Sequence, residues 1–268
     1  MPLSPAAAHA ELTRRRKAHP LAYARLWEPR CHACRAVLVY VGGVSWACLR
    51  CGSEPAERTS QQRTLADFMG SAALIGVVCG GNRSGKTVIG AQWTVASALG
   101  RDHPDVVQWG QANGLDLSSI STGPGVMWAD ALTFPDSRRY VRTNLRKYVP
   151  EDTVYRNWFA ENEAEALLPN GGKIVCKAIT QRREGHQGDA IRGAWIDEEP
   201  ADAEDVVGEI TVRLADEDGR LLCTYTPLSG YTWLYHRWVE QSSPDVVVRH
   251  LWGEDKPHVR AEVLDSIL

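Results

Sequence analysis

The chain has 268 residues, of which 44% are hydrophobic and 24% charged, and its formal net charge is −3. This composition is typical of a folded protein, and the slightly acidic balance argues against a protein that coats a polyanion. The longest apolar stretch, residues 72–79, is too short to span a bilayer, and the N-terminus lacks the apolar core of a secretory signal. We therefore expect a cytosolic protein with reduced cysteines and no membrane partner.

Residues 1–27 are expected to form an N-terminal helical and basic segment, with a short charged helix over residues 9–18. The basic run TRRRK at 13–17 is interpreted as a solvated helix face, because charge runs usually are. A patch that contacts phosphates is the alternative.

Residues 28–55 contain two CxxC pairs separated by thirteen residues: Cys31, Cys34, Cys48 and Cys51. Four thiolates at this spacing can close a tetrahedral Zn²⁺ site, and the β-rich stretch between them is typical of a zinc ribbon. His32 is an alternative ligand, and two disulfides are the alternative without metal. So small a module needs its metal to fold. The sequence does not decide what this module contacts. DNA and another subunit are candidates, and a purely structural role is the alternative.

A polar stretch at 52–62 is the expected linker, and residues 56–268 are expected to form one α/β domain. Alternating strand and helix patterns predict a mostly parallel sheet with helices on both faces. A helix is predicted over Thr87–Leu99, and another begins in the last residues, 256–268. Strands are predicted over Leu74–Cys79, Asp105–Trp109, Lys173–Ile179, Gly193–Ile196, Arg220–Thr226 and Val246–Leu251. The lone cysteines are expected to be buried in strands: Cys79, Cys176 and Cys223.

The stretch GGNRSGKT fits the P-loop pattern and lies between a predicted strand and a predicted helix. Its glycines let successive backbone N–H groups point at phosphate oxygens, and the following helix presents its positive end to the same anion. Lys86 is expected to reach the outer phosphates and Thr87 to ligate Mg²⁺. A glycine-rich turn is the bland alternative. The predicted nucleotide-binding residues are Gly80, Gly81, Asn82, Arg83, Ser84, Gly85, Lys86 and Thr87.

A second motif, GAWIDEEP at 193–200, places acids at the end of an apolar strand. Asp197 is predicted to hold the Mg²⁺ together with Thr87, and Glu198 to act as the base that polarises the attacking water. Glu199 is expected to orient neighbouring groups, and an acidic surface turn is the alternative reading of the motif. A third strand ends in Thr224–Pro227, where the Thr226 hydroxyl can sense the γ-phosphate.

Together these motifs resemble the ATPase domain of the large terminase subunit, the DNA-packaging motor of tailed bacteriophages. The resemblance covers roughly residues 62–260 and rests on GGNRSGKT, GHQGDAIRGAWIDEEP, VRLADEDGRLLCTYTPLSGYTWLY and LWGEDKPHV. It implies an ASCE-type P-loop NTPase with a small N-terminal zinc ribbon, requiring ATP, Mg²⁺ and Zn²⁺. It also implies double-stranded DNA, portal protein and small terminase subunit as partners. The family acts as homo-oligomeric rings on a procapsid in the host bacterial cytoplasm.

Under this resemblance, Asp197 is the Walker B acid, Glu198 and Lys86 are catalytic, and Thr224–Pro227 couples hydrolysis to movement. Family members carry an adenine-contacting glutamine before the P-loop, for which Gln61 and Gln62 are weak candidates. Gln187 occupies the position where some relatives place an arginine that acts on a neighbouring subunit. The substitutes to test are Arg182, Arg183, Arg192 and, as a further catalytic candidate, Arg83. The chain ends before a C-terminal nuclease domain, so no DNA cleavage is expected of it.

Two other functions are compatible with these motifs. One is a helicase-like DNA translocase, although no convincing further helicase motif follows residue 230. The other is a nucleotide-gated adaptor carrying a zinc ribbon, with little turnover. Glu198 discriminates against the adaptor, because an adaptor needs no base beside the metal-binding acid.

Overall fold

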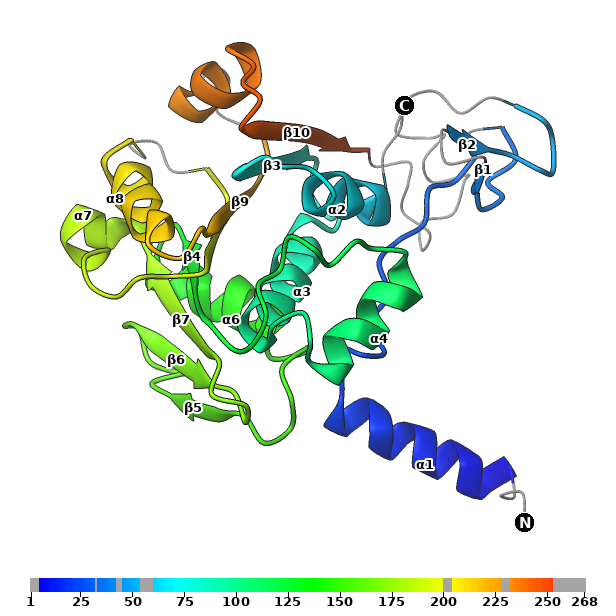
Figure 1. The fold of residues 1–268 in the computed structure, drawn as a ribbon, viewed down its shortest axis with the longest axis horizontal. Coiled ribbons are helices and arrows are strands. Elements are labelled where there is room, and N and C mark those ends of the chain that lie inside the picture. The colour runs from blue at the N-terminus through cyan, green and yellow to red at the C-terminus, as the bar shows by residue number, and fades with distance from the viewer. Residues whose placement is uncertain are drawn as a thin grey trace.

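The computed structural model describes residues 5–31, 33–41, 45–53, 60–199, 204–227 and 232–252. Within them an eight-stranded sheet of order β10-β3-β9-β8-β4-β7-β6-β5 forms the centre of the molecule (Figure 1). Its strands are β3 (Ile75–Gly80), β4 (Val126–Ala131), β5 (Val154–Arg156), β6 (Ala164–Leu167), β7 (Lys173–Ala178), β8 (Gly193–Asp197), β9 (Arg220–Tyr225) and β10 (Val246–Leu251). The six strands from β10 to β7 run parallel, whereas β6 and β5 are antiparallel. The predicted mostly parallel α/β sheet is confirmed.

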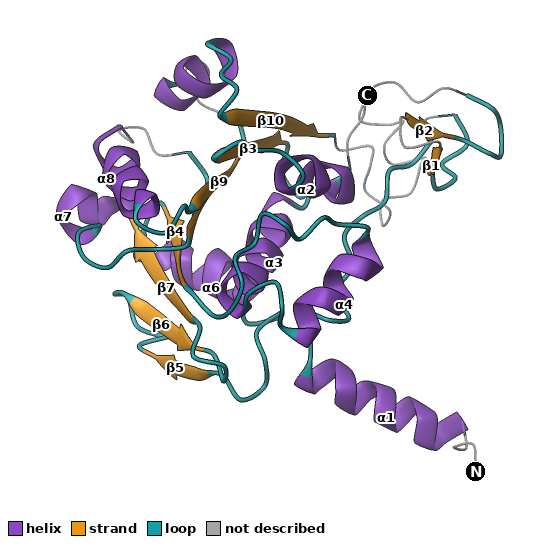
Figure 2. Ribbon diagram, viewed as in Figure 1, coloured by secondary structure: helices purple, strands orange, loops and turns teal. Residues whose placement is uncertain are grey.

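Helices cover both faces of this sheet (Figure 2). Trp93, Trp109 and Leu65 belong to the core on one face, and Ile210 and Trp238 belong to a second core cluster on the other. The helices are α2 (Gln61–Met69), α3 (Lys86–Leu99), α4 (Pro104–Asn113), α5 (Phe134–Asp136), η1 (Ser137–Val141), α6 (Arg142–Leu145), η2 (Ile179–Gln181), α7 (Arg182–Gly185), α8 (Glu204–Ala215) and η3 (Tyr235–Glu240). None of the helices in the described ranges is both long and apolar enough to cross a bilayer.

One strand separates the P-loop strand from the acidic strand. β3 pairs with β9, which in turn pairs with β8. Because all three are parallel, the P-loop after β3 and Asp197 at the end of β8 lie at the same carboxyl edge. Asp197 is in register with Thr224 of β9, so the acid is at the end of the second strand along, not of the immediate neighbour. The strand β9, inserted between the P-loop strand and the acidic strand, is the arrangement of the predicted ASCE-type fold.

Most of the predicted strands are confirmed to within one residue, but the predicted strand Asp105–Trp109 is wrong. These residues lie in α4, which begins at Pro104. The His103 ring accepts a hydrogen bond from the main-chain N–H of Asp105 and caps the helix. Val106, Trp109, Gly110 and Asn113 are buried, which is the i, i+3, i+4, i+7 spacing of a helix rather than the alternation of a strand. The predicted helix start at 256–268 lies outside the described residues.

The N-terminal part contains α1 (Pro5–Ala18) and a hairpin of β1 (Val39–Val41) and β2 (Ser45–Ala47). The predicted helix over 9–18 is confirmed and begins four residues earlier. Figure 1 shows α1 projecting from the body of the molecule at the lower right, with the hairpin at the upper right. The three lone cysteines are buried in β3, β7 and β9, as predicted.

Candidate active site

The P-loop joins β3 to α3 and is held by its own lysine. Lys86 is buried, and its Nζ donates hydrogen bonds to the carbonyl oxygens of Gly80 at 2.7 Å and Gly81 at 3.1 Å. Gly85 has a φ of 92°, and a Cβ there would lie 1.5 Å from Nε2 of Gln61. In the described part of the chain no side chain caps α3, so its first N–H groups are available to an anion.

Asp197 sits at the centre of a hydroxyl network opposite the P-loop. Thr87 Oγ1 lies 3.3 Å from one carboxylate oxygen of Asp197 and 3.4 Å from the other. Thr224 Oγ1 donates to the same carboxylate at 2.8 Å. Burial raises the pKa of Asp197 to about 6. A bound divalent cation would oppose this effect, because it favours the charged carboxylate.

Trp195 supports this network, and our reading of the sequence missed it. Its Nε1 donates to Thr224 Oγ1 at 2.8 Å, which leaves the hydroxyl proton of Thr224 to face Asp197. The buried indole lies beneath α3, where a Cβ at Gly90 would come within 2.1 Å of it. Residues two apart in a strand share a face. The pattern WxD in β8 was therefore a usable signal that Trp195 and Asp197 face α3 together.

Glu198 and Glu199 face different partners. Glu198 adopts a left-handed φ of 70°, a conformation that costs about 1–3 kcal/mol for a non-glycine residue. Its carboxylate accepts hydrogen bonds from the N–H of Thr226 at 2.8 Å and from its Oγ1 at 2.9 Å. Glu199 instead accepts a hydrogen bond from the Thr232 hydroxyl, and burial raises its pKa to about 7. The strand end after β8 is thus tied directly to the strand end after β9.

The arginine candidates are placed differently. Arg192 precedes β8, at the amino edge of the sheet, and its guanidinium donates to main-chain carbonyl groups there. This position is at the far end of β8 from Asp197 of the same chain, so Arg192 stays a candidate only for the site of a neighbouring subunit. Arg183 donates to Glu209 at 3.0 Å, whereas Arg182 is exposed with a φ of 56°.

A buried histidine anchors the segment that carries these arginines. His186 Nε2 lies 2.7 Å from Asp130 Oδ1, and Nδ1 lies 2.7 Å from the carbonyl oxygen of Arg182. The carbonyl oxygen can only accept a hydrogen bond, and so can Asp130 when ionised, so the arrangement suits an imidazolium that donates from both ring nitrogens. Burial by itself would lower the pKa of His186, but the hydrogen bond and the charge of Asp130 raise it above 6.5.

This pair predicts a pH-dependent contribution to stability. Because the pKa of His186 is higher in the folded protein than its ordinary value of 6.5, its pair with Asp130 contributes fully to stability below pH 6.5. This contribution is lost as the pH rises through the raised, folded-state pKa. We expect the difference in free energy of unfolding between wild type and His186→Gln to be larger at low pH and to shrink as pH increases. Urea unfolding of both proteins at several pH values measures it. A difference that stays constant across the series contradicts the imidazolium.

The four cysteines that flank the N-terminal hairpin come together. Their Sγ atoms all lie within 4.8 Å of one another, with Cys31 and Cys51 3.5 Å apart and Cys34 and Cys48 3.4 Å apart. Four thiol ligands at this separation fit a tetrahedral zinc site, in which each Zn–S bond is about 2.3 Å long. None of the four forms a disulfide. The alternative ligand His32 lies outside the described residues.

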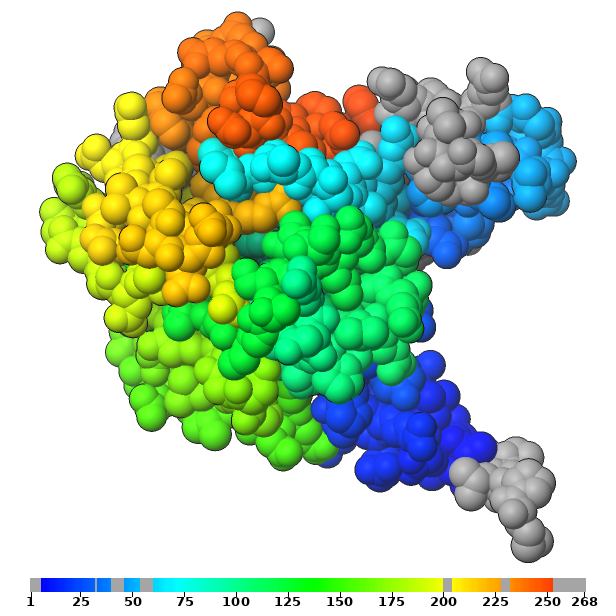
Figure 3. All heavy atoms as spheres, in the orientation of Figure 1, coloured from blue at the N-terminus to red at the C-terminus, as the bar shows by residue number. Residues whose placement is uncertain are grey.

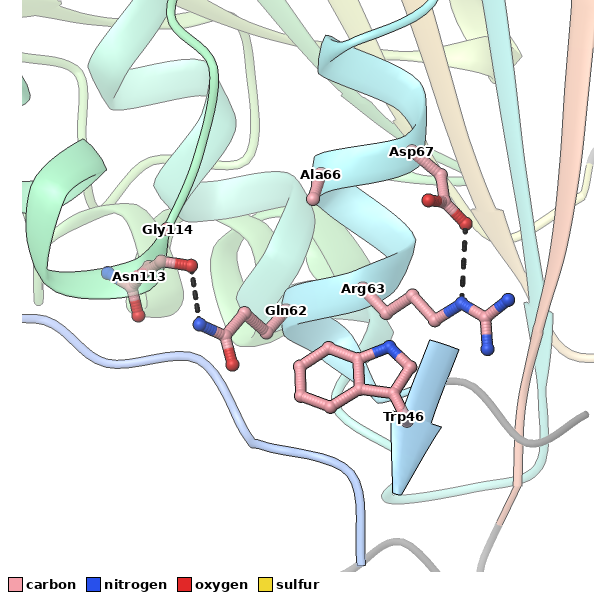
Figure 4. Close-up of a pocket in the computed structure, with 7 residues that line it drawn as sticks. All are labelled: Trp46, Gln62, Arg63, Ala66, Asp67, Asn113 and Gly114. Atoms are coloured by element: carbon pink, nitrogen blue, oxygen red, sulfur yellow. Dashed lines mark hydrogen bonds and ion pairs between the residues drawn. The ribbon is translucent and has the colours of Figure 1, made fainter. Parts of the chain in front are cut away.

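The hairpin faces the helix that precedes the P-loop strand. Trp46 of β2 and the α2 residues Gln62, Arg63 and Asp67 line a pocket of about 320 Å³ (Figure 4). Gln62 Nε2 donates to the carbonyl oxygen of Asn113 at the end of α4, 2.5 Å away. The hairpin thus contributes a side chain to a pocket otherwise lined by α2 and the end of α4.

The neighbouring glutamine supports the P-loop. Gln61 Oε1 accepts from the N–H of Trp27 at 3.3 Å, and Nε2 donates to the carbonyl oxygen of Gly85 at 3.1 Å. Both ends of this amide are therefore engaged by main chain. Gln61 joins the N-terminal segment to the turn that opens α3.

The fold and the loop define a P-loop NTPase of the ASCE type. The sequence model of the family described as "Terminase large subunit, T4likevirus-type, N-terminal" matches residues 77–260, and the chain belongs to this family. The resemblance seen in the motifs is confirmed. No curated protein sequence gives a significant match.

Solved structures of the large terminase from a thermophilic bacteriophage share the fold. One crystal form has a TM-score of 0.54 at 16% identity, covering 77% of this chain and 48% of that one. The complex with ADP has a TM-score of 0.53 at 16% identity, and the complex with ATP-gamma-S has 0.51 at 15%, both with the same coverages. The present chain therefore spans about half the length of those terminase chains.

Proposed function

We propose that this chain is the ATPase domain of a phage DNA-packaging motor, hydrolysing ATP to drive double-stranded DNA into a procapsid. The observation that carries the proposal is the convergence of Lys86 and Thr87 of the P-loop with Asp197 and Glu198 at one edge of the sheet. Membership of the terminase family and the nucleotide complexes of the thermophilic phage terminase support it.

The residues divide the work according to their chemistry. The N–H groups of the loop 80–87 and the Lys86 ammonium would hold the phosphates, and the Thr87 hydroxyl and Asp197 carboxylate would hold Mg²⁺. A hydroxyl and a carboxylate whose oxygens lie 3.3 Å apart are oxygen ligands of the kind that Mg²⁺ prefers. Bound Mg²⁺ would neutralise charge on the phosphates. Glu198 would orient and deprotonate the attacking water.

The contact between Glu198 and Thr226 suggests how turnover reaches the rest of the domain. Both carboxylate oxygens of Glu198 are now bound by Thr226. Each oxygen keeps a second acceptor position for water. A proton taken up by Glu198 would remove the charge that strengthens both hydrogen bonds. The strand end at 224–227 then experiences the state of the catalytic carboxylate, which is the link proposed between hydrolysis and movement.

A neighbouring subunit would complete the site with an arginine, as expected for a ring. Arg182 and Arg83 are exposed and are the first to test.

The test of the proposed function is steady-state ATP hydrolysis over a series of protein concentrations, with Mg²⁺ and with EDTA. We expect turnover that rises faster than linearly with concentration and is absent in EDTA. Tight ATP binding without turnover at any concentration would instead support the nucleotide-gated adaptor.

The remaining assignments follow from the same proposal. The chain would act at the portal of the procapsid in the host bacterial cytoplasm, together with the small terminase subunit, and its three parts would be residues 1–27, 28–55 and 56–268. The chain spans about half the length of those terminase chains, and ATP hydrolysis is the activity proposed for it.

Zinc binding by the ribbon is tested by metal content. We expect about one Zn²⁺ per chain in the wild type and nearly none in Cys48→Ser, because a structural site needs all four thiolates. Cys223→Ser is the matched control, since this cysteine is buried in β9 away from the cluster and its loss should leave the zinc in place. Elemental analysis of the purified proteins measures both. A wild-type chain without zinc, or zinc retained in Cys48→Ser, contradicts the site.

A further inference from the structure

A basic groove lies between the C-terminal end of α1 and the segment after α6. It has a volume of about 400 Å³, and two parts of the chain far apart in sequence form it. Figure 3 shows α1, in blue, extending from the body beside the groove's other wall. The lining residues that matter here are Arg16, Lys17, Arg146, Lys147, Glu151 and Tyr155. Four cations thus face one acid, in a chain whose net charge is −3.

On one wall, the two cations are held in place without being neutralised. The guanidinium of Arg146 lies over the rings of Tyr155 and Phe159, 5.8 Å and 5.6 Å from their centroids. Lys147 Nζ donates to the side-chain oxygen of Asn144 at 2.9 Å. These partners are uncharged, so they position the cations and leave their charge available to a ligand.

The α1 wall has one paired and one unpaired cation. Lys17 forms an ion pair with Glu151 across the groove, 2.7 Å apart, which joins the two walls. Arg16 is exposed and has no ion-pair partner among the residues that the structure describes. By contrast, Arg14 on the same helix is bound by Glu11 at 2.8 Å. Arg15 shares Glu11 with Arg14, so Arg16 is the cation of this stretch that lines the groove without an acidic partner in the described residues.

We propose that this groove binds the phosphodiester backbone of duplex DNA. The choice of DNA rests on the proposed packaging function, but the charge pattern stands on its own. A phosphate backbone needs only exposed cations spaced along a surface, and arginine and lysine supply most such contacts. An acidic peptide carries the same charge as a phosphate backbone, so it is the competing ligand in the test. α1 lies outside residues 77–260, which the family model matches, whereas the other wall of the groove lies within them.

The test uses the full chain, a fluorescent duplex of about 30 base pairs of arbitrary sequence, and a salt series. We expect Arg16→Glu/Arg146→Glu to bind the duplex at least about tenfold more weakly than the wild type, with a salt slope shallower by about 2. The control Arg101→Glu/Arg237→Glu makes the same change in net charge at exposed sites outside the groove and should bind like the wild type. Basal ATP hydrolysis, measured without DNA, should be equal in all three proteins.

A second measurement needs no variant. DNA should protect Lys17 and Lys147 of the wild type from acetylation, while Lys173, outside the groove, stays reactive. Equal DNA affinities for the two double variants, or no protection of Lys17 and Lys147, would overturn the proposal. The proposal would also be overturned if Arg16→Glu/Arg146→Glu lost binding of a poly-glutamate peptide but kept binding of DNA. If Arg16→Glu/Arg146→Glu loses DNA binding but hydrolyses ATP normally, the groove is separate from the active site. A wild-type protein without ATP hydrolysis would instead contradict the proposed function.

Discussion

Glu198→Gln is expected to bind ATP about as well as the wild type and to hydrolyse it at least about a hundredfold more slowly, because general bases contribute about 10²–10⁴ to rates. Glutamine has the shape of glutamate and keeps an oxygen that can accept a hydrogen bond from Thr226, so the left-handed turn after β8 should survive. The substitution removes the charge and the ability to take a proton, while its amide can still accept from the N–H of Thr226 and donate to the Thr226 hydroxyl. Single-turnover hydrolysis and equilibrium binding of ATP to the same preparation measure the two effects separately.

The matched control for this variant is Glu217→Gln. Glu217 is a half-exposed carboxylate whose ion-pair partner, Arg192, is 3.9 Å away at the opposite edge of the sheet. Surface pairs of this kind contribute little to stability, so this variant should hydrolyse ATP at the wild-type rate. Wild-type turnover by Glu198→Gln would show that another group takes the proton, and equal losses in both variants would indicate a general effect of removing charge.

The parts of the site that the sequence predicted are those built by local patterns. Residues 75–80 form a short apolar strand, a glycine-rich turn follows, and α3 begins at once, so strand, loop and helix were visible within one stretch. Asp197 was also found locally, at the end of an apolar strand. Parallel strands bring their carboxyl ends to one edge, so two local patterns were enough to predict that Lys86 and Asp197 meet.

The parts that the sequence did not predict depend on contacts between distant segments. Trp195 acts through Thr224, 29 positions away, and Gln61 reaches Gly85 across 24 positions. The error at residues 105–109 had a different origin. The apolar side chains of that stretch were counted as a strand, although Pro104 and the glycine at 114 mark the ends of a helix.

The contact between Glu198 and Thr226 could not be read from the motifs either. Sequence patterns assigned one residue to catalysis and the other to coupling, as if these were separate tasks. In the structure the two side chains bind each other, because Glu198 leaves the strand in a left-handed turn and faces β9. The two roles proposed here, catalysis and coupling, therefore fall on one hydrogen-bonded pair.

Lys86→Ala is expected to lose ATP binding as well as turnover, in contrast to Glu198→Gln. The Lys86 ammonium is buried and donates to two loop carbonyl groups, so it is already directed into the space that the P-loop encloses. Charge-assisted hydrogen bonds contribute about 1.5–3 kcal/mol each, so the loss of one or two should weaken binding by roughly tenfold to ten-thousandfold. Calorimetric titration with a non-hydrolysable ATP analogue measures the change.

Thermal unfolding provides an independent measurement of the same loss. A ligand that binds only the folded state stabilises it in proportion to ln(1 + [L]/Kd), so ATP should raise the wild-type unfolding temperature. The rise should vanish in Lys86→Ala and persist in Lys173→Ala, whose lysine pairs with Glu165 on β6, far from the loop. A nucleotide-dependent rise that survives in Lys86→Ala would mean that backbone N–H groups alone hold the phosphates. The lysine would then serve only to close the empty loop on Gly80 and Gly81.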